Sequence, residues 1–158
     1  MPDSFAIVDL RDAAGFAGIV ADRVWRAWWK DEGVPFAALK ARLSESLGPS
    51  RAAIPTSFIA CQGWEFLGTV ALIASDVEER PGLTPWIAAL WVEEPARARG
   101  IGQALLTHAT DVAFAAGHAR LYLCATAANA PYYLRRGWVQ IEEDVDGLDI
   151  FRREREKA

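Results

Sequence analysis

The chain has 158 residues, the length of one domain, and its 52% apolar and 11% aromatic content can supply one sizeable core. Its 17 basic and 21 acidic residues leave a net charge of −4, which argues against a nucleic-acid partner, because such proteins carry a basic surface. No apolar run approaches the roughly 20 residues of a membrane span, and the N-terminal residues do not resemble a signal peptide, so we expect a cytoplasmic protein with no membrane partner.

The N-terminal third of the sequence predicts one strand followed by two helices. Residues 5–10 form a short apolar strand, after which Asp12 is placed to cap a helix. The apolar stripe of this helix consists of Phe16, Ile19, Val20, Val24 and Trp28. Trp25 and Trp29 widen the stripe, and we expect it to be buried against a sheet, with membrane contact or a partner groove as the alternative. A second amphipathic helix follows over residues 35–48.

The rest of the sequence predicts strands separated by two further helices. Two antiparallel strands begin at Thr56 and are joined by a tight hairpin at Gln62 and Gly63. After a polar loop over 75–84, the predicted elements are a buried strand over 85–92, a helix from Ile101 to Gly117, a strand over 120–125, a short helix over 129–136, and final strands over 138–142 and 148–153. This order predicts an α/β fold (α+β, with one mixed sheet and helices on both faces) in a single domain over 1–158.

The turn between the strand over 85–92 and the next helix has the composition of a phosphate-binding loop. Glycines let the backbone approach a ligand, and amides at a helix N-terminus bind a pyrophosphate that the helix dipole favours. Arg97 and Arg99 add cationic donors beside Gly100 and Gly102. A basic turn that needs its glycines only for geometry is the alternative. A Rossmann loop fits less well, because its third glycine would fall at Leu105.

Two motifs together resemble the GNAT superfamily of N-acetyltransferases. Val92 and residues 97–102 match the strand end and the R/Q-x-x-G-x-G/A loop that open the long helix of that family. The stretch RLYLCATAANAPYYLRRGW resembles its next strand and short helix, with Tyr132, Tyr133 and an aromatic residue after Gly137. The resemblance covers residues 57–152, whereas the first two helices match only in order and length.

The resemblance implies a GNAT-like acyl-CoA N-acyltransferase fold, in which the parallel strands over 86–92 and 120–124 splay apart to admit CoA. Acetyl-CoA is then the co-substrate, and no metal is needed. The pantetheine is expected to pair with Trp91 and Val92. The pyrophosphate is expected to bind Arg97 and the backbone of the residues that follow it, which are Ala98, Arg99, Gly100, Ile101, Gly102 and Gln103. Asn129 contacts the same arm or, alternatively, caps the short helix.

The same resemblance assigns catalysis to Tyr133, which matches the general acid of the family, whereas Tyr132 matches a packing aromatic. Packing is also the alternative role for Tyr133. The strand over 85–92 has no carboxylate or histidine where some relatives carry a Glu, so we assign no general base. We expect His108 and His118 to be surface residues. Cys61 and Cys124 lack the spacing of a metal site or redox pair, and we expect free thiols.

Two acidic clusters suggest that the acceptor amine is cationic. They comprise Asp76, Glu78 and Glu79 in one loop, and Glu142, Glu143, Asp144 and Asp146 in another. Solvated turns explain the same charges equally well. The sequence therefore predicts an N-acetyltransferase acting on a small or peptide amine. A non-catalytic acyl-CoA-binding module and a nucleotide-binding module are the alternatives, and a homodimer is left open.

Overall fold

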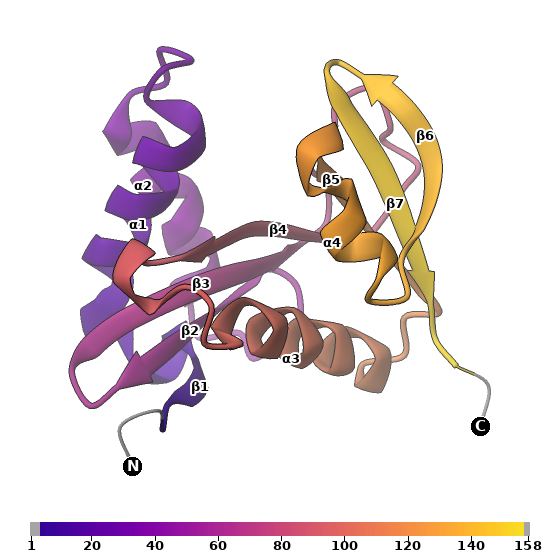
Figure 1. The fold of residues 1–158 in the computed structure, drawn as a ribbon. Helices are drawn as coiled ribbons and strands as arrows, with labels where there is room; N and C mark the ends of the chain where they lie inside the picture. The colour runs from indigo at the N-terminus through magenta and orange to yellow at the C-terminus, as the bar shows by residue number, and fades with distance from the viewer. Residues whose placement is uncertain (1–3, 157–158) are drawn as a thin grey trace.

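A computed structural model describes residues 4–156 and contains one mixed sheet with helices on both faces (Figure 1). The strands are β1 (Ala6–Asp9), β2 (Thr56–Gln62), β3 (Glu65–Ile73), β4 (Trp86–Val92), β5 (Arg120–Ala125), β6 (Val139–Val145) and β7 (Leu148–Glu154). The helices are α1 (Ala17–Val24), α2 (Phe36–Ser44), α3 (Ile101–Ala115) and α4 (Ala130–Leu134). This is the predicted order of elements. The domain prediction over 1–158 also includes residues 1–3 and 157–158, which lie outside the described residues.

The described residues form a seven-stranded sheet in the order β1-β2-β3-β4-β5-β7-β6. All neighbouring strands are antiparallel except β4 and β5, which are parallel. Helix α3 covers one face of the sheet, and α1 and α2 lie on the other face (Figure 1). The predicted mixed sheet is confirmed.

The helix predicted to begin at Asp12 starts later and ends differently. Two 3-10 turns precede α1, no side chain of the described chain caps its N-terminus at Phe16, and Asp12 forms an ion pair with Arg51 at 2.7 Å instead. The capping prediction is therefore wrong, because a partner distant in sequence binds the Asp12 carboxylate. A π-helical turn, Trp25–Trp29, extends α1. Trp28 in this turn is 42% exposed, so the prediction that it is buried is also wrong.

Strand β4 was expected to be buried throughout, and only its first two residues are. Trp86 and Ile87 are buried at 0% and 3% exposure, whereas residues 88–92 are half-buried. The reason is that β5 diverges from β4 after its first residue pair, which leaves the later part of the strand without a neighbour on that side.

The close approach of α3 to the sheet depends on Gly68 of β3. A Cβ atom at this position would lie 2.7 Å from the carbonyl oxygen of Trp91 and 3.1 Å from Cδ1 of Leu105. Those distances leave no room for a side chain between β3, β4 and α3. Gly68 thus sets the position of α3 relative to the end of β4.

We expect Gly68→Ala to lower the free energy of unfolding by about 1–3 kcal/mol, the usual cost of overpacking a core. The melting temperature should fall by roughly 2–4 °C for each kcal/mol in a domain of this size. Gly18→Ala is the matched control, because Gly18 is exposed in α1 and no described atom lies within 4 Å of its added Cβ. Equal melting temperatures for the two variants would show that the contact at Gly68 relaxes freely.

Candidate active site

Strands β4 and β5 separate soon after they meet. Trp86 and Tyr122 are their only paired residues in the described chain, and the Tyr122 amide donates to the carbonyl of Pro85 at 3.1 Å. Beyond this point the edge of β4 that faces β5 pairs with no described strand. The predicted splay between parallel strands is present, and it leaves backbone donors and acceptors of β4 open to a ligand.

A β-bulge lies in β4 beside this splay. Thr69 and Ala71 of β3 pair with Trp91 and Ala88, so two residues of β4 oppose one residue of β3. Ala89 within the bulge has a φ of +54°, in the left-handed region. A bulge removes one residue from the ladder and frees its amide. Free amides at this position are the kind of donor that an oxyanion requires. No glycine marks the bulge, and sequence reasoning did not find it.

The predicted phosphate loop, residues 97–102, precedes the first hydrogen bond of α3. Gly100 has a φ of +79°, and the first helical bond runs from the Ala104 amide to the Gly100 carbonyl at 3.0 Å. No side chain among residues 4–156 caps this helix, so the amides of Ile101, Gly102 and Gln103 have no partner within it. An added Cβ at Gly100 would meet no described atom within 4 Å, so the space beside this glycine is open.

Arg97 connects the phosphate loop to the end of β4. Its Nε donates to the Val92 carbonyl at 2.9 Å, and its guanidinium lies 4.8 Å from the Trp91 ring centroid. Ala98, the next residue, has a φ of +67°. The predicted pantetheine and pyrophosphate contacts are therefore adjacent in space. Arg97 thus donates to the Val92 carbonyl, one of the backbone groups that the resemblance assigns to the pantetheine.

The two tyrosines of α4 lie beside the phosphate loop and the splay. The Tyr132 hydroxyl oxygen lies 3.4 Å from the position of a Cβ on Gly102, and the guanidinium of Arg136 lies 3.5 Å from the Tyr132 ring centroid. Tyr133 packs edge-to-face on Tyr132 and at a tilt on Phe151, with ring centroids 5.2 and 5.9 Å apart. Burial, with smaller effects of neighbouring groups, raises the pKa of Tyr133 to about 12, so its phenol is protonated at neutral pH.

Asn129 occupies the N-cap position of α4 and is exposed. Its side chain forms no capping hydrogen bond with the described residues. The alternative role of Asn129, capping α4 with its side chain, is therefore not seen, and its contact with the CoA arm stays a prediction.

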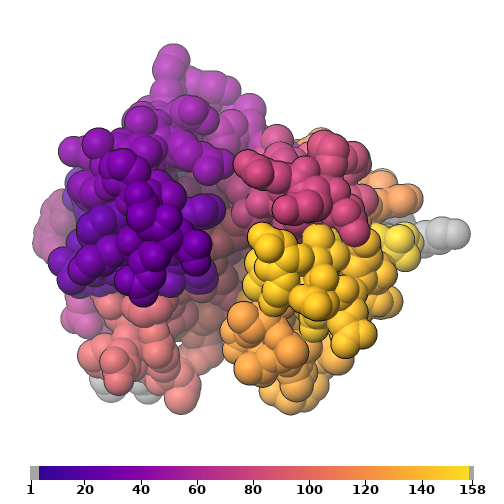
Figure 2. Space-filling view, turned by 90° about the horizontal axis from the view of Figure 1, so that it is seen from above, coloured from indigo at the N-terminus to yellow at the C-terminus, as the bar shows by residue number. Residues whose placement is uncertain are grey.

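A cleft separates α1 and α2 from the loop after β3 and from strands β6 and β7 (Figure 2). A cavity of about 440 Å³ lies between α1 with its π-helical turn and the end of β4, and is lined by Arg23, Arg26, Ala27, Trp91, Glu93, Glu94 and Pro95. Nε of Arg23 binds the Glu93 carboxylate at 2.7 Å, and Trp28 packs edge-to-face on Trp91 at 6.4 Å. The cleft meets the splay from the side opposite α3.

In each of the two predicted acidic clusters, one carboxylate binds another side chain. Nε and Nη2 of Arg80 both bind the Glu142 carboxylate, at 2.6–2.9 Å, and this ion pair lowers the pKa of Glu142. The pair ties the loop after β3 to β6 and compensates one of the charges proposed to attract a cation. Asp76 is half-buried and accepts a hydrogen bond from Sγ of Cys124 at 3.3 Å. Both cysteines are free thiols, as predicted.

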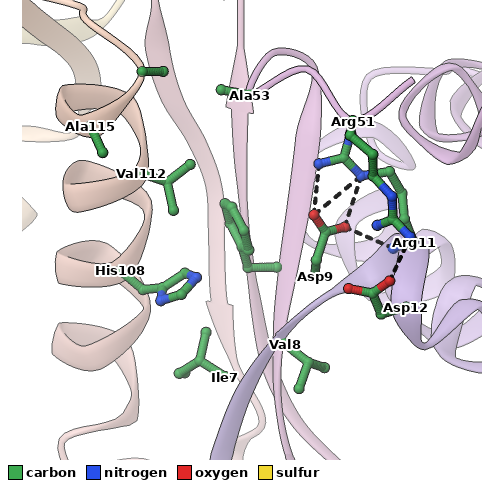
Figure 3. Close-up of a pocket in the computed structure, with 12 residues that line it drawn as sticks. Ile7, Val8, Asp9, Arg11, Asp12, Arg51, Ala53, His108, Val112 and Ala115 are labelled. Carbon is green, nitrogen blue, oxygen red and sulfur yellow. Dashed lines mark hydrogen bonds and ion pairs between the residues drawn. The ribbon is translucent and has the colours of Figure 1, made fainter. Parts of the chain in front are cut away.

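A separate cavity of about 710 Å³ lies between α3 and the strands β1 and β2 (Figure 3). His108 lines it and packs edge-to-face on Phe58 at 4.7 Å, so this histidine is half-buried rather than a surface residue. Asp9 and Arg11 form an ion pair on the opposite wall. The phosphate loop and α4 contribute no lining residue among those described, which places this cavity outside the active site.

Within the described range, no group of three or more His, Cys, Asp or Glu side chains is arranged to hold a metal ion. No helix in the same range is both long and apolar enough to cross a membrane.

Known structures share this fold. An acetyltransferase from Streptococcus agalactiae is 14% identical, with a TM-score of 0.71 over 96% of this chain and 98% of its own. An aminoglycoside 6'-N-acetyltransferase complexed with coenzyme A is 14% identical, with a TM-score of 0.74 over 97% and 99%. A GCN5-related N-acetyltransferase from Ralstonia eutropha is 24% identical, with a TM-score of 0.62 over 89% and 95%. At these identities the likeness establishes the fold alone. No curated protein sequence matches the chain.

The sequence itself matches a family model. The model of the acetyltransferase (GNAT) family matches residues 21–138, which is more than half of the chain. The matched range contains β4, the phosphate loop, α3 and both tyrosines of α4. The fold agrees with this assignment, and the chain belongs to the GNAT family of acyl-CoA-dependent acetyltransferases.

Proposed function

We propose that this chain is a single-domain N-acetyltransferase that passes the acetyl group of acetyl-CoA directly to a primary amine. The observation that supports this most is the adjacency of an open strand edge and an uncapped helix N-terminus in the described chain. The first offers backbone groups to a pantetheine, and the second offers amides to a pyrophosphate. One CoA molecule would use both.

In this proposal, CoA binds through the residues predicted from the sequence. The edge of β4 at Trp91 and Val92 pairs with the pantetheine, the backbone of residues 98–103 binds the pyrophosphate, and Asn129 contacts the same arm. We expect Arg97 to leave the Val92 carbonyl when CoA binds, because a guanidinium interacts more strongly with phosphate oxygens than with a neutral carbonyl.

The chemistry then follows from groups on the two sides of the splay. The neutral amine nitrogen, arriving through the cleft, bonds the acetyl carbon and loses a proton to solvent, and the bond from that carbon to sulfur then breaks. Amides at the β4 bulge donate hydrogen bonds to the developing oxyanion. Tyr133 donates its phenolic proton to the departing sulfur, and its raised pKa keeps that proton available at neutral pH.

Free-thiol release from acetyl-CoA over a panel of amines tests this function, with CoA binding followed in parallel by calorimetry. An aminoglycoside belongs in the panel, because two proteins with this fold are aminoglycoside 6'-acetyltransferases. Amino acids, simple amines and a peptide with a free N-terminus complete it. We expect thiol release that requires an amine. CoA binding without release for any amine would indicate a non-catalytic acyl-CoA-binding module, and NAD binding without CoA binding a nucleotide-binding module.

A further inference from the structure

Asp76 is a half-buried carboxylate in the loop between β3 and β4, close enough to α2 for the charge of Arg42 to act on it. The neighbouring Val77 is 7% exposed and packs in a small core with Trp86 and Tyr122, which anchors the loop beside the splay. The Asp76 carboxylate accepts its hydrogen bond from Cys124 of β5 at 3.3 Å. The adjacent acidic residue Glu78 is exposed. The loop therefore directs one of its carboxylates inward and leaves the next one in solvent.

The register of the strands places this carboxylate level with the bulge. Tyr122 pairs with Trp86, so Cys124, two residues further along a parallel strand, comes level with Ala88, next to Ala89 of the bulge. Cys124 also shares the face of Tyr122, because side chains two apart in a strand point the same way. Asp76, bound to Cys124, is thus level with the part of β4 where the acetyl carbon is expected, on the other side of the splay.

Asp76 and Tyr133 lie on opposite sides of the sheet. Leu121 and Leu123 pack in the core that contains α3, and Tyr133 packs against that same core. Cys124 packs instead in the small core of Val77, Trp86 and Tyr122, on the side of the cleft. A carboxylate on the acceptor side and a phenol on the thioester side face the splay between them. This is the arrangement that removing a proton from the amine and delivering one to sulfur requires.

We propose that Asp76 is the general base: its carboxylate binds the ammonium group of a cationic amine in the cleft and takes one proton from it, which leaves the neutral nitrogen free to bond the acetyl carbon. The proposal rests on the acetyltransferase function proposed above. Asp76 passes this proton to solvent through the cleft and then takes the second proton, which nitrogen loses once it has bonded the acetyl carbon. As the carbon–sulfur bond breaks, the sulfur receives a proton from Tyr133, which regains one from solvent. An acceptor that is protonated in solution fits this carboxylate better than a neutral one.

The charges around Asp76 suit this role. Burial raises the pKa of Asp76, which makes the carboxylate a stronger base, while the Cys124 hydrogen bond and the charge of Arg42 on α2 act in the opposite direction. Burial, followed by the charge of Asp76, raises the pKa of Cys124 to about 12, so the thiol stays protonated and remains a donor. On β6, Glu142 is bound to Arg80, and Glu79 on the same loop as Asp76 is exposed.

The test uses Asp76→Asn, with Glu78→Gln as the matched control on the same loop. Asn keeps the size of the side chain and an oxygen that accepts from Cys124. We expect kcat for an accepted amine to fall by about 10² to 10⁴ at unchanged CoA affinity, and the remaining activity to rise with pH as the neutral fraction of the amine rises. The wild type should instead show an acidic limb in kcat/KM that reports the carboxylate. Glu78→Gln should match the wild type.

A second variant keeps the test informative where Asp76→Asn folds poorly. Cys124→Ala removes the hydrogen bond that lowers the pKa of Asp76, so the acidic limb should move to higher pH, and Cys124→Ser should move it back. Two results with an active wild type would overturn the role of Asp76 and leave the proposed function intact. In the first, Asp76→Asn keeps kcat within about threefold of the wild type; in the second, Cys124→Ala leaves the pH of the acidic limb unchanged. A wild type that binds CoA but acetylates no amine overturns both.

Discussion

Replacing Tyr133 with Phe should lower kcat by about 10² to 10⁴, or about 3 to 5 kcal/mol in activation free energy, with little change in CoA affinity. Phe keeps the ring that packs on Tyr132 and Phe151 and removes only the proton donor. Because burial raises the pKa of Tyr133 to about 12, the donor form persists far above neutral pH. The wild-type kcat should therefore show no alkaline decline from this residue until the pH approaches that value. Steady-state kinetics across pH checks both statements.

Tyr132→Phe is the matched control for this experiment. Its hydroxyl lies beside Gly102 of the phosphate loop, and its ring packs under Arg136, so the variant loses a hydroxyl near that loop and keeps its packing. We expect a small change in kcat. A Tyr133→Phe enzyme that stays within about threefold of the wild-type kcat, well below the range of general acid catalysis, would reduce Tyr133 to a packing residue.

Gly100→Val should raise the CoA dissociation constant at least tenfold, which is about 1.4 kcal/mol. A branched side chain at this position would fill the open space beside the first amides of α3, where each hydrogen bond to a charged phosphate contributes about 1.5–3 kcal/mol. The φ of +79° also strains any residue with a Cβ atom, at about 1–2 kcal/mol, so the protein should lose stability as well. Calorimetric titration with CoA and thermal unfolding separate the two effects.

The other end of α3 supplies the control. Gly117 also has a positive φ, +101°, and an added Cβ would meet no described atom within 4 Å. Gly117→Val should lose a similar amount of stability and bind CoA like the wild type. A folded Gly100→Val protein with wild-type CoA affinity would show that the pyrophosphate binds elsewhere.

The order of the elements could be predicted because local patterns carry it. The apolar runs of β2 and β3 on either side of Gly63, and the spacing of Ile101, Leu105 and Ala109 in α3, specify strand and helix without reference to the rest of the chain. Residue pairs distant in sequence were not predictable in this way. Asp12 meets Arg51, 39 residues away, and the helix cap expected from its local position is lost.

The candidate site likewise has parts that local motifs predict and parts that depend on contacts between residues distant in sequence. The phosphate loop and the tyrosines of α4 follow from contiguous motifs, and the structure places them together. The bulge at Ala89 has no marker, since alanine rarely adopts a positive φ and the bulge arises from pairing with β3. The inward direction of Asp76 depends on the burial of Val77 against β4 and β5, which a polar loop sequence does not reveal.

The bulge also makes the length of β4 matter independently of its composition. Ile87, before the bulge, and Leu90, its second residue, both pack on the α3 side although they are three positions apart, whereas Trp91 packs on the α1 side. Residues three positions apart face opposite sides of a regular strand, so a β4 of this length without the bulge would turn Leu90 toward α1 and Trp91 toward α3. Deleting one residue between Ile87 and Leu90 would keep both on the α3 side but would remove the bulge. Exchanging Ala89 for another residue that tolerates the left-handed region would leave every other side chain of β4 on its present face of the sheet. Relatives of this chain should therefore vary in sequence here more freely than in the number of residues between Trp86 and the phosphate loop.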